Sequence, residues 1–318
     1  MSAPRVLVTG AAGFVGANLV RTLVERPESV HGIVRPETDG WRLEGLPTRF
    51  HLHRIDLTNA ADVGHVVRSV RPDIIVHLAK HRGDPHTLDY RGAYATNVHA
   101  TLNLLEAAAQ LSNLRRFVHA GSSLEYDLER SPLREDDPST PVTVHGVTKA
   151  AATALCLHFA RRHRVPVVVL RLFTVYGPWE DPGRFVPRLL RSVLGGPPLR
   201  LTREGLRHDW IYVADVVDAC CRAMDEDLVT GHVINVGTGR QSSNEELVRI
   251  VEDAAGRAVP RDAETFPDRP WDSATWVADV SKAREYLRWS ATTSLRDGLA
   301  RTFAWFHAHR TGGEVART

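Results

Sequence analysis

The glycine-rich segment at residues 9–16, Thr-Gly-Ala-Ala-Gly-Phe-Val-Gly, constrains the fold more than any other feature of this chain. It follows the apolar run Val-Leu-Val and precedes an amphipathic stretch that reaches about Val24. Glycines at a strand-to-helix turn let the backbone approach a ligand, and the helix N-terminus attracts phosphate. The motif therefore predicts a dinucleotide-binding βαβ unit at the start of the chain. We expect five residues to contact the pyrophosphate: Gly10, Gly13, Phe14, Val15 and Gly16.

Strand and helix patterns alternate along the first half of the chain after this motif. Short apolar runs predict strands at residues 30–35, 72–78, 116–120 and 165–171, and one that ends near 55. Helical periodicity covers residues 62–70, 93–111 and 143–163. Such alternation is typical of a parallel sheet with helices on both faces. We therefore expect an α/β fold, a Rossmann-type doubly wound parallel sheet with a smaller C-terminal α/β substrate-binding lobe.

The composition changes after Gly177-Pro178, where Pro, Gly, Arg and Trp become frequent and the expected strands become short. We expect residues 1–178 to form the dinucleotide-binding domain, and residues 179–208 and 241–318 to form the smaller lobe. Residues 233–236 (Val-Ile-Asn-Val) are typical of a strand that returns to the main sheet, so the first domain is also expected to receive residues 209–240.

Charge and hydropathy exclude several classes of partner. The formal net charge is +2, from 40 basic and 38 acidic residues, which gives no basic excess for a nucleic acid. No apolar run reaches the roughly 18 residues that a membrane helix needs, and no signal peptide precedes the first strand. The three cysteines do not have the spacing of a zinc site. We expect a cytoplasmic protein with no metal, membrane or nucleic-acid partner.

The ends of the second and third strands predict which dinucleotide binds. An acidic residue after the second strand would bind the ribose 2′-hydroxyl of NAD, but this chain has Arg35 there and no acid before Glu37. A guanidinium suits the 2′-phosphate of NADP. We therefore expect NADP, with NAD as the alternative. Asp56 and Leu57, just past the third strand, are expected near the adenine.

Further segments have a recognisable pattern. They are His77-Leu-Ala79, Asn97, Asn103-Leu-Leu-Glu-Ala107, Gly121-Ser-Ser-Leu-Glu-Tyr126, Arg171, Tyr176-Gly-Pro178, Asn235-Val-Gly-Thr-Gly239 and Arg269-Pro-Trp-Asp272. Together with the glycine motif, they resemble the extended short-chain dehydrogenases/reductases of the NAD-dependent epimerase/dehydratase family, which modify nucleotide-activated sugars. The resemblance covers nearly the whole chain. It implies further cofactor contacts from Leu78, Ala79, Lys80, Asn97 and Lys149.

The family's catalytic pattern is a Ser or Thr after the fifth strand and Tyr-x-x-x-Lys on the next helix. Ser122 corresponds to the first position, with Ser123 as the near alternative, and Lys149 corresponds to the Lys. The Tyr position holds His145, which departs from the family. Imidazole transfers protons near neutral pH, so we expect His145 to act as the acid/base. The alternatives are proton transfer by water or by another group such as Tyr126, and an inactive site.

Basic residues indicate where a substrate binds. Lys80, His81 and Arg82 follow the fourth strand, at the sheet edge where ligands of such folds bind. Residues 207–215, Arg-His-Asp-Trp-Ile-Tyr-Val-Ala-Asp, resemble the family segment R-D-F-x-Y-V-x-D. The resemblance implies nucleotide-sugar contacts from Ser122, Ser123, Arg184, Arg207, Arg269 and Asp272. The chain contains only three lysines, at positions 80, 149 and 282, against 37 arginines, which favours a specific role for Lys149.

Three functions remain open at this point. The apparent use of Arg35 favours NADPH-dependent reduction of a keto group on a nucleotide-activated, 4-keto-6-deoxy sugar. The alternatives are a sugar-nucleotide epimerase with tightly bound NAD and a cofactor-binding protein without catalysis. The 4,6-dehydratases have T-D-E where this chain has Ser122-Ser-Leu124, which argues against dehydration. The Ala- and Leu-rich helices around residues 95–109 and 147–160 predict a homodimer through a four-helix bundle.

Overall fold

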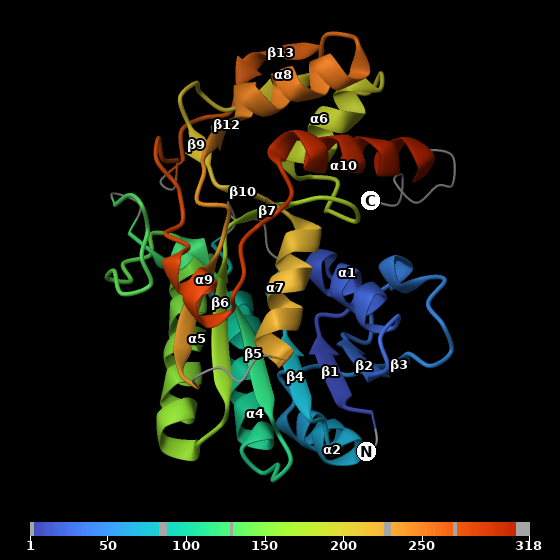
Figure 1. The fold of residues 1–318 in the computed structure, drawn as a ribbon, viewed down its shortest axis with the longest axis vertical. Coiled ribbons are helices and arrows are strands. Elements are labelled where there is room, and N and C mark those ends of the chain that lie inside the picture. Colours follow the sequence, from blue (N-terminus) through green and yellow to red (C-terminus); the bar gives the residue numbers. More distant parts are fainter. Residues whose placement is uncertain (1–2, 83–87, 128–129, 226–229, 270–271, 310–318) are drawn as a thin grey trace.

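Seven parallel strands form the central sheet of the computed structural model, which describes residues 3–82, 88–127, 130–225, 230–269 and 272–309. The strand order is β11-β6-β5-β4-β1-β2-β3 (Figure 1). The strands are β1 (Arg5–Thr9), β2 (Ser29–Val34), β3 (His51–Arg54), β4 (Ile74–His77), β5 (Arg116–Ser122), β6 (Val167–Leu172) and β11 (His232–Val236). The expected doubly wound sheet is therefore present, and β11 pairs with β6 where the sequence predicts a returning strand.

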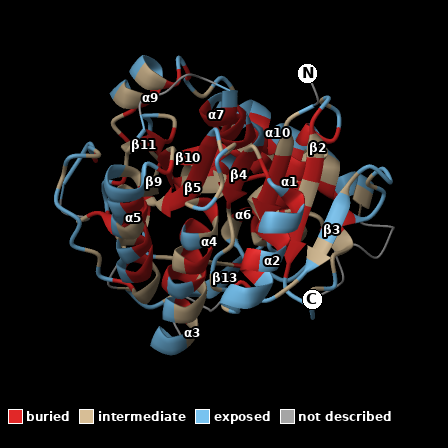
Figure 2. Cartoon of the chain, turned by 90° about the horizontal axis from the view of Figure 1, so that it is seen from below, coloured by how far each residue is buried: buried red, intermediate tan, exposed pale blue. Residues whose placement is uncertain are grey.

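Helices cover both faces of this sheet, because its inner strands have apolar side chains on both faces. One face packs against α2 (Ala60–Val70), α4 (Ala100–Ala108) and α5 (Val144–His163). The other packs against α1 (Phe14–Leu23), α7 (Val213–Asp225) and α9 (Ser281–Tyr286). Figure 2 shows the buried strands between half-exposed helices, with the edge strand β3 largely open to solvent.

The second lobe lies beyond the carboxyl ends of the strands (Figure 1). Its helices are α6 (Phe185–Val193), α8 (Asn244–Ala255) and α10 (Leu295–His309). Its short strands are β7 (Thr174–Tyr176), β8 (Leu199–Leu201), β9 (Arg207–His208), β10 (Trp210–Tyr212), β12 (Ser242–Ser243) and β13 (Arg261–Thr265). A separate apolar core, which includes Tyr176, Leu189, Leu247 and Phe306, holds this lobe together. The exact boundaries of the two lobes stay a prediction.

The helix expected at residues 93–111 is three consecutive segments. It begins as α3 (Tyr90–Tyr94), continues as the π-helical turn η2 (Ala95–His99) and ends as α4. A π-turn holds one extra residue and is common at functional sites. Two short 3-10 turns, η1 (Trp41–Leu43) and η3 (Ser123–Glu125), occur elsewhere. In the part of the chain that the structure describes, no helix has the length and apolar character to cross a membrane.

Candidate active site

The glycine turn between β1 and α1 has the geometry that a bound pyrophosphate requires. Gly10 has a φ of +68°, and a Cβ there would lie 2.7 Å from the backbone nitrogen of Ala79. A Cβ at Gly16 would collide with the carbonyl oxygen of Gly10. Gly13 is the N-cap of α1, and no side chain caps this helix. The first-turn amides of Phe14, Val15 and Gly16 are therefore without a capping side chain, and their contact with a pyrophosphate stays a prediction.

The adenosine end of this site differs from the expectation for NADP. Arg35 follows β2 as predicted, but its Nε lies 3.2 Å from a carboxylate oxygen of Glu37. Asp56 is exposed, and its carboxylate accepts a hydrogen bond from the Thr58 amide. Leu57 is buried beneath it. Glu37, the first acidic residue after β2, is thus in contact with Arg35.

The end of β4 brings the predicted residues Leu78, Ala79 and Lys80 beside the glycine turn. The Leu78 amide donates to the Thr9 carbonyl at 3.2 Å, and the Ala79 amide donates to the Thr9 hydroxyl at 3.4 Å. Lys80 is exposed. Backbone pairing to Thr9 therefore fixes this strand end against the cofactor turn.

A continuous set of buried hydrogen bonds joins this strand end to helix α5. The Thr9 hydroxyl lies 2.7 Å from Nδ1 of His77, and Nε2 of His77 lies 2.9 Å from the Thr101 hydroxyl. Thr101 donates its proton to the Asn97 carbonyl, so His77 must donate from Nε2 and accept at Nδ1. The Asn97 side-chain amide donates in turn to the Thr148 hydroxyl at 2.8 Å.

Asn97, predicted as a cofactor contact, therefore has a positioning role that can be seen in the structure. It lies in the π-turn and is almost fully buried. Its Oδ1 accepts from the His81 amide at 2.8 Å, while its Nδ2 reaches Thr148, whose hydroxyl donates to the carbonyl of His145. Asn97 thus fixes the loop after β4 relative to the helix that holds His145 and Lys149.

Lys149 and His145 lie one helical turn apart on α5 and face the site together. The Lys149 ammonium is buried and donates to the Ala120 carbonyl at 2.6 Å. Burial lowers the pKa of Lys149 to about 8, although the nearby Glu125 carboxylate raises it. Burial, together with the positive charges of Lys149, Lys80 and Arg184, lowers the pKa of His145 to about 3. His145 is therefore a neutral imidazole at pH 7.

Ser122 ends β5 and caps η3, so its hydroxyl is held at the carboxyl edge of the sheet. Its Oγ accepts from the Leu124 amide at 3.2 Å and keeps its own proton for another acceptor. Ser123 is buried. Both carboxylate oxygens of Glu125 are engaged, one with the Ser122 amide and the other with Arg171.

Tyr126, the alternative proton donor, is committed elsewhere. Its hydroxyl donates to Oδ1 of Asn235 at 2.6 Å, and the Arg171 guanidinium covers its ring. The residue is almost fully buried, and burial raises its pKa above the ordinary tyrosine value. These contacts make Tyr126 a structural residue that joins β5 to β11.

The basic side chains that follow β4 lie in different environments. The His81 imidazole lies 3.2 Å from the Asp89 carboxylate, and its charge influences His145. Lys80 also acts on His145. Arg82 is exposed. The structure therefore brings Lys80 and His81 close enough to His145 for their charges to act on it. The next two residues of the chain, Gly83 and Asp84, lie outside the described residues.

The second lobe contributes Arg184, Arg269 and Asp272. Arg184 is the N-cap of α6, with 60% of its side chain exposed, and its charge acts on both His145 and His208. Arg269 donates to Oδ1 of Asp272 at 2.8 Å and 3.0 Å, so these two residues form one unit. Arg269 also lowers the pKa of His208, after burial, to about 4. These residues converge above the carboxyl edge of the sheet.

Arg207 does not join this group. Its guanidinium lies 3.6 Å from the Glu246 carboxylate. Its neighbour His208 lies with Arg269 and Asp272, because successive side chains of β9 point to opposite faces. Counting back from Asp215 through the family segment R-D-F-x-Y-V-x-D also puts His208, not Arg207, at the Arg position. Sequence analysis missed His208, and this count could have found it.

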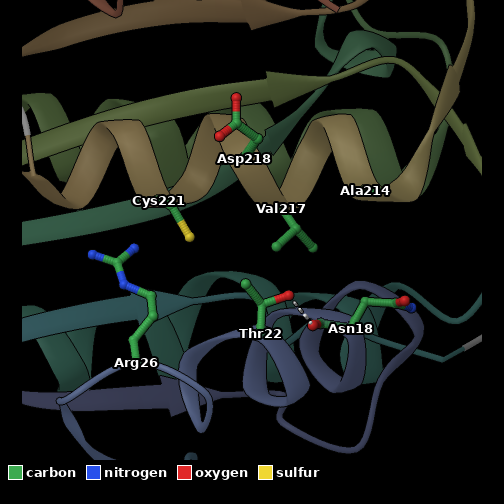
Figure 3. Close-up of a pocket in the computed structure, with 7 residues that line it drawn as sticks. All are labelled: Asn18, Thr22, Arg26, Ala214, Val217, Asp218 and Cys221. Carbon is green, nitrogen blue, oxygen red and sulfur yellow. Dashed lines mark hydrogen bonds between the residues drawn. The ribbon is translucent and has the colours of Figure 1, made fainter. Parts of the chain in front are cut away.

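Two surface depressions lie apart from His145 and Lys149. Figure 3 shows a groove of about 380 Å³ between α1 and α7, lined by Asn18, Thr22, Arg26, Ala214, Val217, Asp218 and Cys221. None of them is a predicted site residue. A second depression, also of about 380 Å³, contains Arg207 with Arg249 and Arg261. Among the described residues, no group of His, Cys, Asp or Glu is arranged to hold a metal ion.

Solved structures share this architecture over nearly their whole length. The UDP-glucuronic acid 4-epimerase from Bacillus cereus, in complex with UDP-glucuronic acid and NAD, is 29% identical with a TM-score of 0.86, over 96% of this chain and 99% of that one. MoeE5 in complex with UDP-glucose and NAD is 33% identical with the same TM-score and coverage. The likeness therefore includes proteins that bind both a nucleotide sugar and NAD.

Curated relatives and a family model agree with this fold. A dTDP-glucose 4,6-dehydratase from Streptomyces griseus is 32% identical over 321 residues, covering 97% of this chain and 96% of the relative. The family model described as the NAD dependent epimerase/dehydratase family matches residues 6–237. With its glycine turn, its Lys149 helix and these matches, the chain belongs to the NAD-dependent epimerase/dehydratase family.

Proposed function

We propose that this protein is a sugar-nucleotide 4-epimerase that holds NAD throughout its reaction cycle. The main support is the electrostatic setting of His145. Burial, with smaller contributions from Lys149, Lys80 and Arg184, lowers its pKa to about 3. A neutral imidazole can accept the proton of a sugar hydroxyl, which the first, oxidising half of an epimerase cycle requires, and it returns that same proton in the second half. A reductase, which sequence analysis favoured, must instead begin with an imidazolium protonated from water, and burial and these cations disfavour that form at pH 7.

The residues of the site divide the chemistry among them. When bound over the glycine turn, NAD supplies a hydride acceptor for the sugar carbon and returns the hydride later. Ser122 holds the sugar oxygen with its free hydroxyl proton. His145 takes the proton of that oxygen and gives it back when the opposite face of the sugar is reduced. Lys149 stabilises the developing oxygen charge and keeps His145 neutral.

The contact between Arg35 and Glu37 supports NAD rather than NADP. A 2′-phosphate placed against Arg35 would also approach the Glu37 carboxylate, 3.2 Å from the guanidinium. Repulsion between these like charges offsets part of the attraction to arginine. The ribose hydroxyls of NAD have no such penalty. NAD is also the dinucleotide in the B. cereus and MoeE5 complexes.

Dehydration is disfavoured because residues 122–124 carry no carboxylate. Residues 122–124 are Ser-Ser-Leu, and the adjacent Glu125 uses both oxygens within the protein. Elimination of water needs an acid and a base beyond the catalytic residue that handles the sugar oxygen. An epimerase needs only the one acid/base, which His145 supplies.

The cations near His145 support a uronic acid as the sugar. The sugar oxygen that His145 reaches is on C4, and the carboxylate of a uronic acid is attached to the neighbouring C5. We infer that Lys80 and Arg184, whose positive charges both act on His145, pair with that carboxylate. We propose a UDP-linked uronic acid as the substrate, with Arg269, Asp272 and His208 at the nucleotide.

The assembly proposed with this function is a homodimer. Tyr94 on α3 is 60% exposed and Val147 on α5 is 52% exposed, and Leu88 and Tyr90 nearby are also open to solvent. Ala151 and Ala154 continue the exposed apolar strip along α5. A second copy that packs the same helices against this strip would bury it in a four-helix bundle.

The test uses the purified protein with no added cofactor. Incubation with UDP-glucuronic acid, followed by proton NMR, should show inversion at C4, faster than with UDP-glucose. Denaturation of the protein should release about one NAD per chain. His145→Phe should still release NAD but form no epimer. Oxidation of added NADPH by a 4-keto sugar without any C4 inversion would instead establish the reductase and overturn this proposal.

A further inference from the structure

A group of buried polar side chains lies directly beneath Lys149, between β5 and α5. The Lys149 ammonium donates to the carbonyl of Ala120. The preceding residue, His119, is fully buried, and its ring centroid lies 5.2 Å from that of His77. Thr153 lies one helical turn beyond Lys149 on the same buried face of α5. His119 and Thr153 have no part in the mechanism proposed above.

His119 and Thr153 share an unusual property. Both ring nitrogens of His119 and the hydroxyl of Thr153 are buried without a hydrogen-bond partner in the described structure. Lys149 has three protons, and the described residues supply one close acceptor for them. Buried polar groups without partners are costly and are commonly satisfied by an internal water molecule with about three hydrogen bonds.

We propose that His119 is a positioning residue for Lys149, because His119 and Thr153 hold a buried water that accepts a hydrogen bond from the Lys149 ammonium. The water donates its two protons to a ring nitrogen of His119 and to the Thr153 oxygen. This arrangement gives a partner to His119 and to Thr153 and a second acceptor to the Lys149 ammonium. Its effect on catalysis rests on the proposed epimerase function, but the water site does not.

The charges around Lys149 agree with this role. The titratable groups that act on it or are acted on by it are Glu125, Lys80, His145, Cys156, His77 and His119. Burial and Lys149 hold the pKa of His119 well below its usual value, so His119 is neutral and one of its ring nitrogens can accept a hydrogen bond. Burial lowers the pKa of Lys149, and a bound water opposes this by stabilising the ammonium form.

The small number of lysines makes a direct test possible. Protein labelled with ¹³C at lysine Cε gives three signals, from Lys80, Lys149 and Lys282, which Lys80→Arg and Lys282→Arg assign by elimination. His119→Phe should lower the pKa of Lys149 by about one to two pH units, the value of a lost charge-assisted hydrogen bond. Thr153→Val should lower it in the same direction and by less.

The controls separate this effect from general destabilisation. Thr302→Val removes an equally buried hydroxyl on α10 and should leave the Lys149 signal unchanged. His119→Gln, which retains a donor and an acceptor, should restore part of the shift. If His119→Phe does not fold, Thr153→Val and His119→Gln still decide the question. A Lys149 pKa that is the same in wild type and in every folded variant overturns the proposal.

The pH dependence of epimerisation gives a second measurement. Turnover should fall where Lys149 loses its proton, and this alkaline limb should move to lower pH in Thr153→Val while KM stays constant. A shifted Lys149 signal in a protein without epimerase activity would support the water site and contradict the proposed function. Epimerase activity with an unshifted Lys149 signal would support the proposed function and contradict the water site.

Discussion

His77 makes the stability of this protein sensitive to mild acid. Its ring is fully buried between the hydroxyls of Thr9 and Thr101, accepting from one and donating to the other. A protonated ring would have to donate from both nitrogens, which the Thr9–His77 bond opposes. Burial, with a further contribution from Lys149, lowers the pKa of His77 from 6.5 to about 3. Below pH 6.5 the unfolded chain therefore binds a proton at His77, whereas the folded chain keeps this ring neutral until the pH approaches 3.

The size of this effect follows from the two pKa values. Folded-state stability from a neutral histidine is present above pH 6.5 and is lost as the pH falls toward the folded value of about 3. Between pH 7 and pH 5, His77 alone should cost about 2 kcal/mol of unfolding free energy. That is a sizeable part of the roughly 5–15 kcal/mol that a folded domain has.

Urea denaturation at pH 7 and at pH 5 measures this loss. His77→Gln retains an amide donor and acceptor but does not titrate, so its stability should fall by about 2 kcal/mol less than that of wild type over this interval. His99→Gln, at an exposed position on η2, is the matched control and should behave like wild type. Equal losses in wild type and His77→Gln would refute the argument, because the folded state would then accept the proton.

Four further predictions concern the site and the assembly. His145→Phe should reduce turnover by about 10²–10⁴, the usual loss for a general acid/base, with little change in cofactor affinity by fluorescence titration; turnover equal to wild type would mean that water or another group moves the proton. Gly13→Val should abolish NAD binding, measured calorimetrically, because the side chain would occupy the pyrophosphate position; retained binding would place the cofactor elsewhere. Glu37→Gln should strengthen NADPH binding relative to NADH, since it removes the charge beside Arg35, and an unchanged ratio would show that Arg35 does not approach the 2′-phosphate. Val147→Arg should convert the proposed dimer to a monomer by light scattering, whereas an unchanged mass would place the interface on another surface.

The sequence predicts those parts of the structure that depend on local periodicity. Apolar runs and helical spacing identify the seven parallel strands and the helices α1, α2 and α5, because parallel strands are buried on both faces. The four-residue spacing places His145 and Lys149 on one face of α5, since it matches one helical turn. The glycine turn likewise follows from local backbone requirements.

Features that depend on the exact path of the backbone are less visible in the sequence. Arg35 alone suggests NADP, but the backbone after β2 returns Glu37 to it. The segment around β9 shows the same limitation, because a two-residue strand has too little pattern to reveal that His208 and not Arg207 faces Arg269. The π-turn was also missed, since one extra residue within a long helix hardly disturbs its apolar periodicity.

That extra residue in η2 has a consequence for how the protein tolerates deletion. Removing one residue from Ala95–His99 would allow a regular α-helix, whose backbone bonds are more favourable than those of a π-turn. The same change would rotate the preceding segment by about 100° about the helix axis. Tyr90 and Tyr94 would leave the surface beside α5, and the Asn97 amide would lose either His81 or Thr148. A chain shortened in this way would have a regular helix here, but Asn97 would no longer hold the loop after β4 in its place against α5.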